Sequence, residues 1–293
     1  MVAPGLEAMK PAPFDYYAPR STAEAVDLLA AHGDEVRVLA GGQSLVPAMN
    51  FRLARPAVLV DINRIAELDF CSVVDGTLAI GALTRHARFQ RPDADGVLGA
   101  LLADVVRYVA HLPIRVRGTF AGSLAHADPA AEWCLVATTL DAQIRARGPD
   151  GERTIAASDF FRSILTTTLR PGELITEVRL PLLGPAWRFG FAEFSRRAGD
   201  FALSMALAVL RMDGERIAEA RLGVGGAGDR PLRIPEAEQA LASTVPDRAA
   251  LAEAGALAAA RVDPFEDLHA SAAYRRDLVR ALTRRALERA LAS

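Results

Sequence analysis

The chain has 293 residues, 51% of them apolar, which is enough for one or two well-buried globular domains. No stretch approaches the roughly 20 uninterrupted apolar residues of a membrane span, and the N-terminus lacks the apolar run of a secretion signal, which favours a cytoplasmic protein. A formal net charge of −2, with arginines scattered among acidic residues, argues against a nucleic-acid partner.

The first elements are an arm and a helix. Residues 1–12 are predicted to form a loose N-terminal arm, and translation could also begin at Met9. Residues 21–32 are predicted to be helical, because Ser21 and Glu24 have capping-box spacing and Gly33 can end the helix.

A strand, a glycine turn and a second strand follow this helix. The strands are predicted over residues 36–40 and 57–62, and the turn begins at residues 41–42. Next comes a predicted β-hairpin over residues 73–83, because Asp75-Gly76 is a strong two-residue hairpin turn.

An amphipathic helix is predicted after the hairpin from six apolar residues in helical spacing, Leu98, Leu101, Leu102, Val105, Val106 and Val109. Residues 117–129 are so rich in small side chains that something is expected to approach their backbone closely. Residues 174–180 alternate as a strand, and the Pro and Gly of residues 181–185 indicate a linker. We therefore place a domain boundary near residue 186.

The C-terminal part, residues 187–293, is predicted to combine an antiparallel sheet with helices. Strand-like runs occupy residues 189–196, 201–212 and 216–224, and three helical stretches begin near Glu236, Asp247 and Tyr274. Six arginines of the last helix are expected to form a solvated face, with partner docking as the less favoured use: Arg275, Arg276, Arg280, Arg284, Arg285 and Arg289.

The most informative local sequence is the turn after the first strand. Gly41 and Gly42 end the strand, and Ser44 places a hydroxyl three positions after the first glycine. Such a turn exposes backbone N–H groups that can bind a pyrophosphate without a lysine, although two glycines alone equally fit a tight turn with no ligand. No Walker motif is present, because no Gly-Lys-Ser/Thr follows.

A family resemblance covers almost the whole chain. Residues 40–49 (AGGQSLVPAM) and 119–132 (TFAGSLAHADPAAE), with shorter segments at 61–65, 171–175 and 195–202, resemble the FAD-binding medium subunit of molybdenum hydroxylases. That family includes relatives of xanthine dehydrogenase, aerobic carbon monoxide dehydrogenase and nicotine dehydrogenase.

The resemblance implies an α+β fold. Residues 13–186 would form a two-lobed FAD-binding fold of the vanillyl-alcohol-oxidase (PCMH) type, with lobes of about 13–65 and 66–186 and the cofactor between them. Residues 187–293 would form a C-terminal domain of the carbon monoxide dehydrogenase flavoprotein type, made of an antiparallel sheet plus helices.

The resemblance also implies FAD as the cofactor and assigns residues to it. The pyrophosphate would be wrapped by Ala40, Gly41, Gly42, Gln43, Ser44, Leu45, Val46 and Pro47. The same phosphates would be held from the other lobe by Thr119, Phe120, Ala121, Gly122 and Ser123. Glu132 would lie near the ribose or adenine, and Ile175 would pack on the cofactor. Glu193 and Asp200 lie in segments that would border the isoalloxazine ring.

Several positions depart from the family pattern. Ala121 stands where the family usually has glycine, and Glu132 where it often has aspartate. The lysine that relatives often carry near Ala192 or Glu193 is missing, which puts its interaction with the flavin in doubt. Gln43 replaces the histidine typical of carbon monoxide dehydrogenases, so the sequence does not assign a substrate.

Other motifs are weaker. Residues 223–228 match the dinucleotide fingerprint GxGxxG, but Pro231 and Pro235 interrupt the helix that this fingerprint requires, so a closely packed strand end is favoured. Cys71 and Cys134 lie outside any CxxC spacing and are expected to be buried thiols. The histidines lack metal-ligand spacing, so no metal site is predicted.

No convincing catalytic acid, base or nucleophile emerges, so no catalytic residue is predicted. The hypothesis is that electrons pass from a molybdenum-cofactor large subunit through an iron-sulfur small subunit to FAD here, and then to an external acceptor. The resemblance implies a dimer of heterotrimers. Two alternatives stay open: a stand-alone FAD-dependent oxidase or reductase of the same fold, and a nucleotide-binding module without redox activity.

Overall fold

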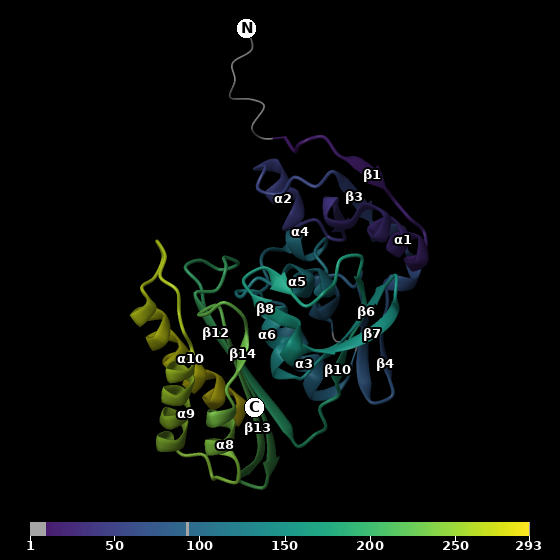
Figure 1. Cartoon of the computed structure of the whole chain (residues 1–293). Helices are drawn as coiled ribbons and strands as arrows, with labels where there is room; N and C mark the ends of the chain where they lie inside the picture. The colour runs from purple at the N-terminus through teal and green to yellow at the C-terminus, as the bar shows by residue number, and fades with distance from the viewer. Residues whose placement is uncertain (1–9, 92–93, 293) are drawn as a thin grey trace.

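The computed structural model describes residues 10–91 and 94–292, so most of the predicted N-terminal arm lies outside the described residues. Three sheet-based units follow one another along the chain: a first lobe, a second lobe and a C-terminal domain (Figure 1). Short 3-10 helices occur in the first two units, at η2 (Gly33–Glu35), η3 (Ile62–Arg64), η4 (Ala66–Leu68) and η5 (His86–Gln90).

The first lobe is a three-stranded parallel sheet with two helices. Its strands, in the order β1-β3-β2, are β1 (Asp15–Tyr17), β3 (Val58–Asp61) and β2 (Val36–Leu39), and its helices are α1 (Thr22–His32) and α2 (Leu45–Asn50). The hydroxyl of Ser21 accepts a hydrogen bond from the Glu24 N–H at 3.2 Å, and Gly33 ends α1 with φ of 53°. The predicted helix, its caps and both strands are therefore confirmed.

The second lobe is a five-stranded antiparallel sheet. In the order β4-β5-β10-β6-β7 its strands are β4 (Cys71–Val74), β5 (Thr77–Gly81), β10 (Leu174–Pro181), β6 (Gln143–Gly148) and β7 (Gly151–Ala156), and a separate hairpin pairs β8 (Phe161–Ser163) with β9 (Thr166–Thr167). Asp75 and Gly76 have φ of 48° and 73°, as a tight primed turn requires, so the predicted hairpin is confirmed.

The second lobe also contains helices, two of which contact strands of the C-terminal domain. The helices are α3 (Gly96–Val105), α4 (Leu112–Arg115), α5 (Phe120–His126), α6 (Glu132–Thr139) and α7 (Ala157–Phe160). The amphipathic helix ends at Val105, earlier than predicted, although Val109 is still buried. The chain turns directly after the helix, and one nitrogen of the Arg115 guanidinium lies within 3.1–3.3 Å of the carbonyl oxygens of this turn, those of Val106, Arg107, Val109 and Ala110.

The C-terminal domain is an antiparallel sheet with helices on one face, as predicted. Its strands, in sheet order, are β11 (Trp187–Phe194), β12 (Ser204–Asp213), β13 (Arg216–Gly225) and β14 (Leu232–Arg233). The helices α8 (Pro235–Leu241), α9 (Arg248–Arg261) and α10 (Ala272–Ala292) cover the face away from the second lobe (Figure 1). The opposite face packs on the second lobe through Phe191, Met205, Leu207 and Val209.

The prediction that six arginines of the last helix form a solvated face is wrong for Arg275. Its side chain is 2% exposed and donates hydrogen bonds to the carbonyls of Leu203 and Gly226, at 2.9 and 3.0 Å. It also forms an ion pair with Asp267 at 2.8 Å. The expectation holds for the other five arginines, Arg276, Arg280, Arg284, Arg285 and Arg289, which are exposed.

The glycine-rich end of β13 packs closely on the second lobe. A side chain at Gly223 would collide with Thr139 of α6, and one at Gly225 would lie 3.3 Å from the Pro129 carbonyl. Gly226 donates its N–H to that carbonyl at 2.8 Å. These contacts support close packing, rather than a dinucleotide turn, as the reason for the glycines.

Candidate functional site

The glycine loop after β2 lines a cavity of about 370 Å³. The cavity is bordered by Leu39, Ala40, Gly41, Gly42, Gln43, Val46, Pro47, Asp61, Asn63 and Arg117. All except Arg117 come from the first lobe. Arg117 precedes the second predicted signature, so the cavity lies where the two lobes meet.

Gly41 is the point of closest contact between the lobes. An added Cβ atom there would lie 2.5 Å from the Arg117 carbonyl oxygen and 2.6 Å from the Gly118 Cα atom, far inside van der Waals contact. Gly42 has φ of 73°, in the left-handed region that favours glycine. Glycine is therefore required at the two positions for different reasons. Gly41 lets the two lobes come into contact, and Gly42 adopts the backbone conformation of the turn.

The same loop presents unused backbone donors. Among the described residues, no hydrogen bond uses the N–H groups of Gly42, Gln43 or Ser44, while Val46 donates to the Gly42 carbonyl at 3.0 Å. Successive free N–H groups in a tight turn form a concave anion site. The loop therefore fits a diphosphate, and α2 begins directly after it at Leu45.

A hydrogen-bonded network from both lobes holds the loop. Asn63, just after β3, donates its amide to the Ala40 carbonyl at 2.8 Å and accepts from Arg85 at 2.5 Å. Arg85 also donates to the Arg117 carbonyl. The sequence indicated a close approach to the backbone of residues 117–129, but it assigned no role to the Arg117 side chain and none to Arg85, because those roles depend on contacts between distant segments. The position of Asp61 and Asn63 at the end of a parallel strand was the one available signal.

The second signature is mostly helix. The Thr119 hydroxyl caps α5 by accepting from the Gly122 N–H at 3.0 Å. Phe120 is fully buried and its ring packs 5.0 Å from that of Trp133, so only its backbone could face a ligand. The Ala121 methyl, the departure from the family pattern, fits the core with 3% exposure. Ser123 is half-buried and lines neither cavity described here.

His86 fastens the start of this segment to the core. Its backbone N–H donates to the Gly118 carbonyl at 3.0 Å, and Trp133 donates its indole N–H to His86 Nδ1 at 2.9 Å. Burial, with added repulsion from Arg85 and Arg115, lowers the pKa of His86 to about 4. The ring is therefore neutral at physiological pH and accepts from Trp133.

We expect the His86 ring to stay neutral from about pH 8 down to about pH 5 in the folded protein. Since its folded pKa lies below the unfolded value near 6.5, the stability that it contributes is present above that value and is lost as pH falls toward 4. An NMR titration of the imidazole carbons checks this, with the urea-unfolded chain as control. Protonation near pH 6.5 in the folded chain would contradict it.

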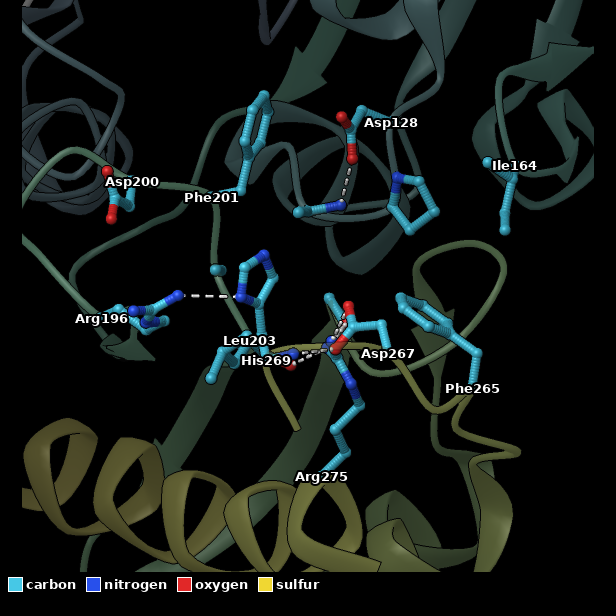
Figure 2. A pocket seen from close by; sticks show the side chains of 14 residues that line it. Asp128, Ile164, Arg196, Asp200, Phe201, Leu203, Phe265, Asp267, His269 and Arg275 are labelled. Carbon is cyan, nitrogen blue, oxygen red and sulfur yellow. Dashed lines mark hydrogen bonds and ion pairs between the residues drawn. The ribbon is translucent and has the colours of Figure 1, made fainter. Parts of the chain in front are cut away.

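A second cavity, of about 330 Å³, lies between the second lobe and the C-terminal domain (Figure 2). Its lining residues are Asp128, Pro129, Ala130, Ile164, Arg196, Asp200, Phe201, Ala202, Leu203, Gly226, Phe265, Asp267, His269 and Arg275. Arg196 hydrogen-bonds with His269 at 2.9 Å. The Arg275 guanidinium lies 4.3 Å from the centre of the Phe265 ring.

The two cavities lie at opposite ends of α5. Arg117 of the first cavity precedes this helix, and Asp128 of the second follows it. Seven helical residues span about 10 Å at 1.5 Å per residue. Both cavities therefore border the segment that carries the second signature.

The remaining predicted site residues fall into three environments. Asp200 lines the second cavity and is exposed. Glu132 and Glu193 lie in the seam between the second lobe and the C-terminal domain, where burial raises the pKa of both carboxyl groups. Ile175 is 3% exposed in β10, opposite Ala146, and lines neither cavity. The structure thus brings the first loop to Arg117 and Gly118 but leaves Ile175 apart from both cavities.

Cys71 and Cys134 are both buried, as predicted. Within residues 10–91 and 94–292, no cluster of three or more His, Cys, Asp or Glu side chains could hold a metal ion. No helix in the same part of the chain is long and apolar enough to cross a membrane.

Two family profiles match the sequence. Residues 12–183 match the FAD-binding domain in molybdopterin dehydrogenase, and residues 189–290 match the carbon monoxide dehydrogenase flavoprotein C-terminal domain. The predicted α+β class is confirmed, with its two-lobed PCMH-type FAD-binding fold and its C-terminal sheet-and-helix domain.

Relatives match over nearly their whole length. The chain is 41% identical to subunit alpha of the 6-hydroxypseudooxynicotine dehydrogenase complex of Paenarthrobacter nicotinovorans, covering 97% of this chain and 96% of that one. It is 35% identical to the carbon monoxide dehydrogenase medium chain of Afipia carboxidovorans, covering 97% and 99%. The solved quinoline 2-oxidoreductase of Pseudomonas putida 86 superposes with a TM-score of 0.90 at 37% identity, covering 97% and 99%. The chain therefore belongs to the family of FAD-binding medium subunits of molybdenum hydroxylases.

Proposed function

We propose that this chain accepts electrons from an iron-sulfur small subunit, within a complex that also holds a molybdenum-cofactor large subunit, and passes them through FAD to an external acceptor. The observation that carries the proposal is the contact of Gly41 with Arg117 and Gly118, which joins two lobes around a loop of unused N–H donors. The names of the relatives, a medium chain and a complex subunit, support a role inside an assembly.

In this proposal the chain's own residues bind and orient the cofactor. The N–H groups of Gly42, Gln43 and Ser44 hold the diphosphate, and the segment from Thr119 to Ser123 faces it from the second lobe, although the Gly122 and Ser123 N–H groups already donate to Thr119. Leu45, Val46 and Pro47 continue the first loop, while Ala40 fixes its start through Asn63. When bound, FAD supplies the redox chemistry, which side chains alone do not provide.

The other predicted residues complete the binding surface. Glu132, Glu193 and Asp200 would border the cofactor where the second lobe meets the C-terminal domain, and Ile175 would support it through the core of the second lobe. We further propose residues 13–186 as the FAD-binding unit and 187–293 as the C-terminal domain. A cytoplasmic location and a dimer of heterotrimers complete the proposal.

The test begins with the chain purified alone. It is expected to bind added FAD, turn yellow and fail to oxidise small substrates, because electrons reach it only from partner subunits. Affinity purification from the native host is expected to recover a larger and a smaller subunit that contain molybdenum and iron. Failure to take up FAD would leave only a non-redox module, and turnover by the isolated yellow protein would favour a stand-alone oxidase or reductase.

A further inference from the structure

The strand register places Glu193 on the face of the C-terminal sheet that meets the second lobe. Glu193 is opposite Met205, and Met205 is opposite Gly225, so the three form one row across β11, β12 and β13. Side chains in such a row point to the same face. Met205 belongs to the core shared with the second lobe, whereas the neighbouring Ala192 belongs to the core under the C-terminal helices. Glu193 therefore points toward the second lobe.

Glu132 approaches the same face from the start of α6. The turn before this helix is held to the sheet by the hydrogen bond from Gly226 to the Pro129 carbonyl. Glu132 is 9% exposed, and one carboxylate oxygen of Glu193, Oε2, is buried without a hydrogen-bond partner. Among the described residues, neither carboxylate forms an ion pair. The seam thus holds two carboxyl groups without a counter-charge.

Electrostatics favour protonation of this pair. Burial raises the pKa of Glu132, and the nearby Asp128 raises it further. Burial also raises the pKa of Glu193, and Glu132 adds to that effect. Two residues along β11 from Glu193, the Tyr108 ring packs on the Phe191 ring and the Arg289 guanidinium donates to the Phe191 carbonyl. Two carboxylates in such a site cannot both ionise readily and titrate as a unit.

We propose that Glu132 and Glu193 share one proton at neutral pH and that the neutral carboxyl group donates a hydrogen bond to bound FAD. This inference rests on the proposed function. Glu132 lies two residues after Ala130 and Glu193 three residues before Arg196, so both glutamates lie behind the wall of the second cavity, which Ala130 and Arg196 line. A shared-proton pair presents an O–H donor beside carboxylate acceptors, and the flavin ring carries carbonyl and ring-nitrogen acceptors for such a donor.

The first measurement needs no cofactor. Infrared spectra of the chain without FAD are expected to show the carbonyl stretch of a protonated carboxyl group at about pH 7. An ordinary glutamate, with a pKa of about 4.3, is ionised at that pH and lacks this band. The band should disappear toward about pH 10 and be missing in the double variant E132Q/E193Q. The control Glu215→Gln, in the exposed turn after β12, should keep it. A wild-type chain without the band at pH 7 overturns the shared proton.

The second measurement is FAD affinity as a function of pH. The wild-type dissociation constant is expected to rise on the order of tenfold between about pH 7 and about pH 10, as the donor is lost. Glu193→Gln keeps an N–H donor that does not titrate, so its affinity should change less than about threefold over that range. If the FAD affinity of the wild type and that of E193Q depend equally on pH, this inference is wrong but the proposed function still stands. No FAD binding by the wild type at any pH overturns the proposed function as well.

Discussion

Replacing Gly41 with alanine is expected to weaken FAD binding by about 10- to 100-fold, because the new methyl group cannot coexist with the present position of the second lobe. Its Cβ atom would lie 2.5 Å from the Arg117 carbonyl oxygen and 2.6 Å from the Gly118 Cα atom, both of which are rigid backbone. The lobes must therefore move apart at the point where the diphosphate is proposed to be held from both sides.

Fluorescence titration of the cofactor-free chain with FAD measures this loss, and circular dichroism shows whether the variant is folded. Gly184→Ala is the matched control, because an added Cβ atom there meets nothing within 4 Å and Gly184 has no left-handed φ. The control should bind FAD as the wild type does. Wild-type affinity in Gly41→Ala would show that the contact between the lobes has no part in binding.

Local sequence signals located the elements that depend on short-range rules. The cap at Ser21 and the turn at Asp75 and Gly76 are set by neighbouring residues, and the structure places both where the sequence indicated. The glycine loop at Gly41 was recognisable for the same reason. The segment from residue 117 onward was expected to be approached closely, but the direct contact of Gly41 with Arg117 and Gly118 was not predicted, because it depends on how the two lobes dock.

The parts of the site that the sequence did not reveal arise from long-range packing. Asn63, Arg85 and Arg117 become one network only because residues far apart in the chain meet beside the loop. Glu132 and Glu193 were each predicted from the family resemblance, but their pairing follows from strand register and from the docking of α6. Charge patterning likewise could not show which arginine of the last helix is buried.

Replacing Arg275 with alanine is expected to reduce the free energy of unfolding by about 2–4 kcal/mol, mainly because buried carbonyl groups lose their donor. The Asp267 carboxylate that remains is 33% exposed and can be solvated. The guanidinium is 2% exposed and pairs with Asp267 at 2.8 Å (Figure 2). Its removal also leaves the carbonyls of Leu203 and Gly226 without the donor that they now share. Urea unfolding followed by circular dichroism measures the loss.

Arg284→Ala on the same helix is the control, because Arg284 is exposed and its pair with Glu288 at 3.4 Å is an ordinary surface pair worth about 0.5 kcal/mol or less. A loss below about 1 kcal/mol in Arg275→Ala would mean that water or a neighbouring group replaces the guanidinium. Leu203 and Gly226 are also walls of the second cavity, so a large loss of stability should be accompanied by weaker FAD binding. The same arginine would then stabilise the domain and shape the cofactor's surroundings.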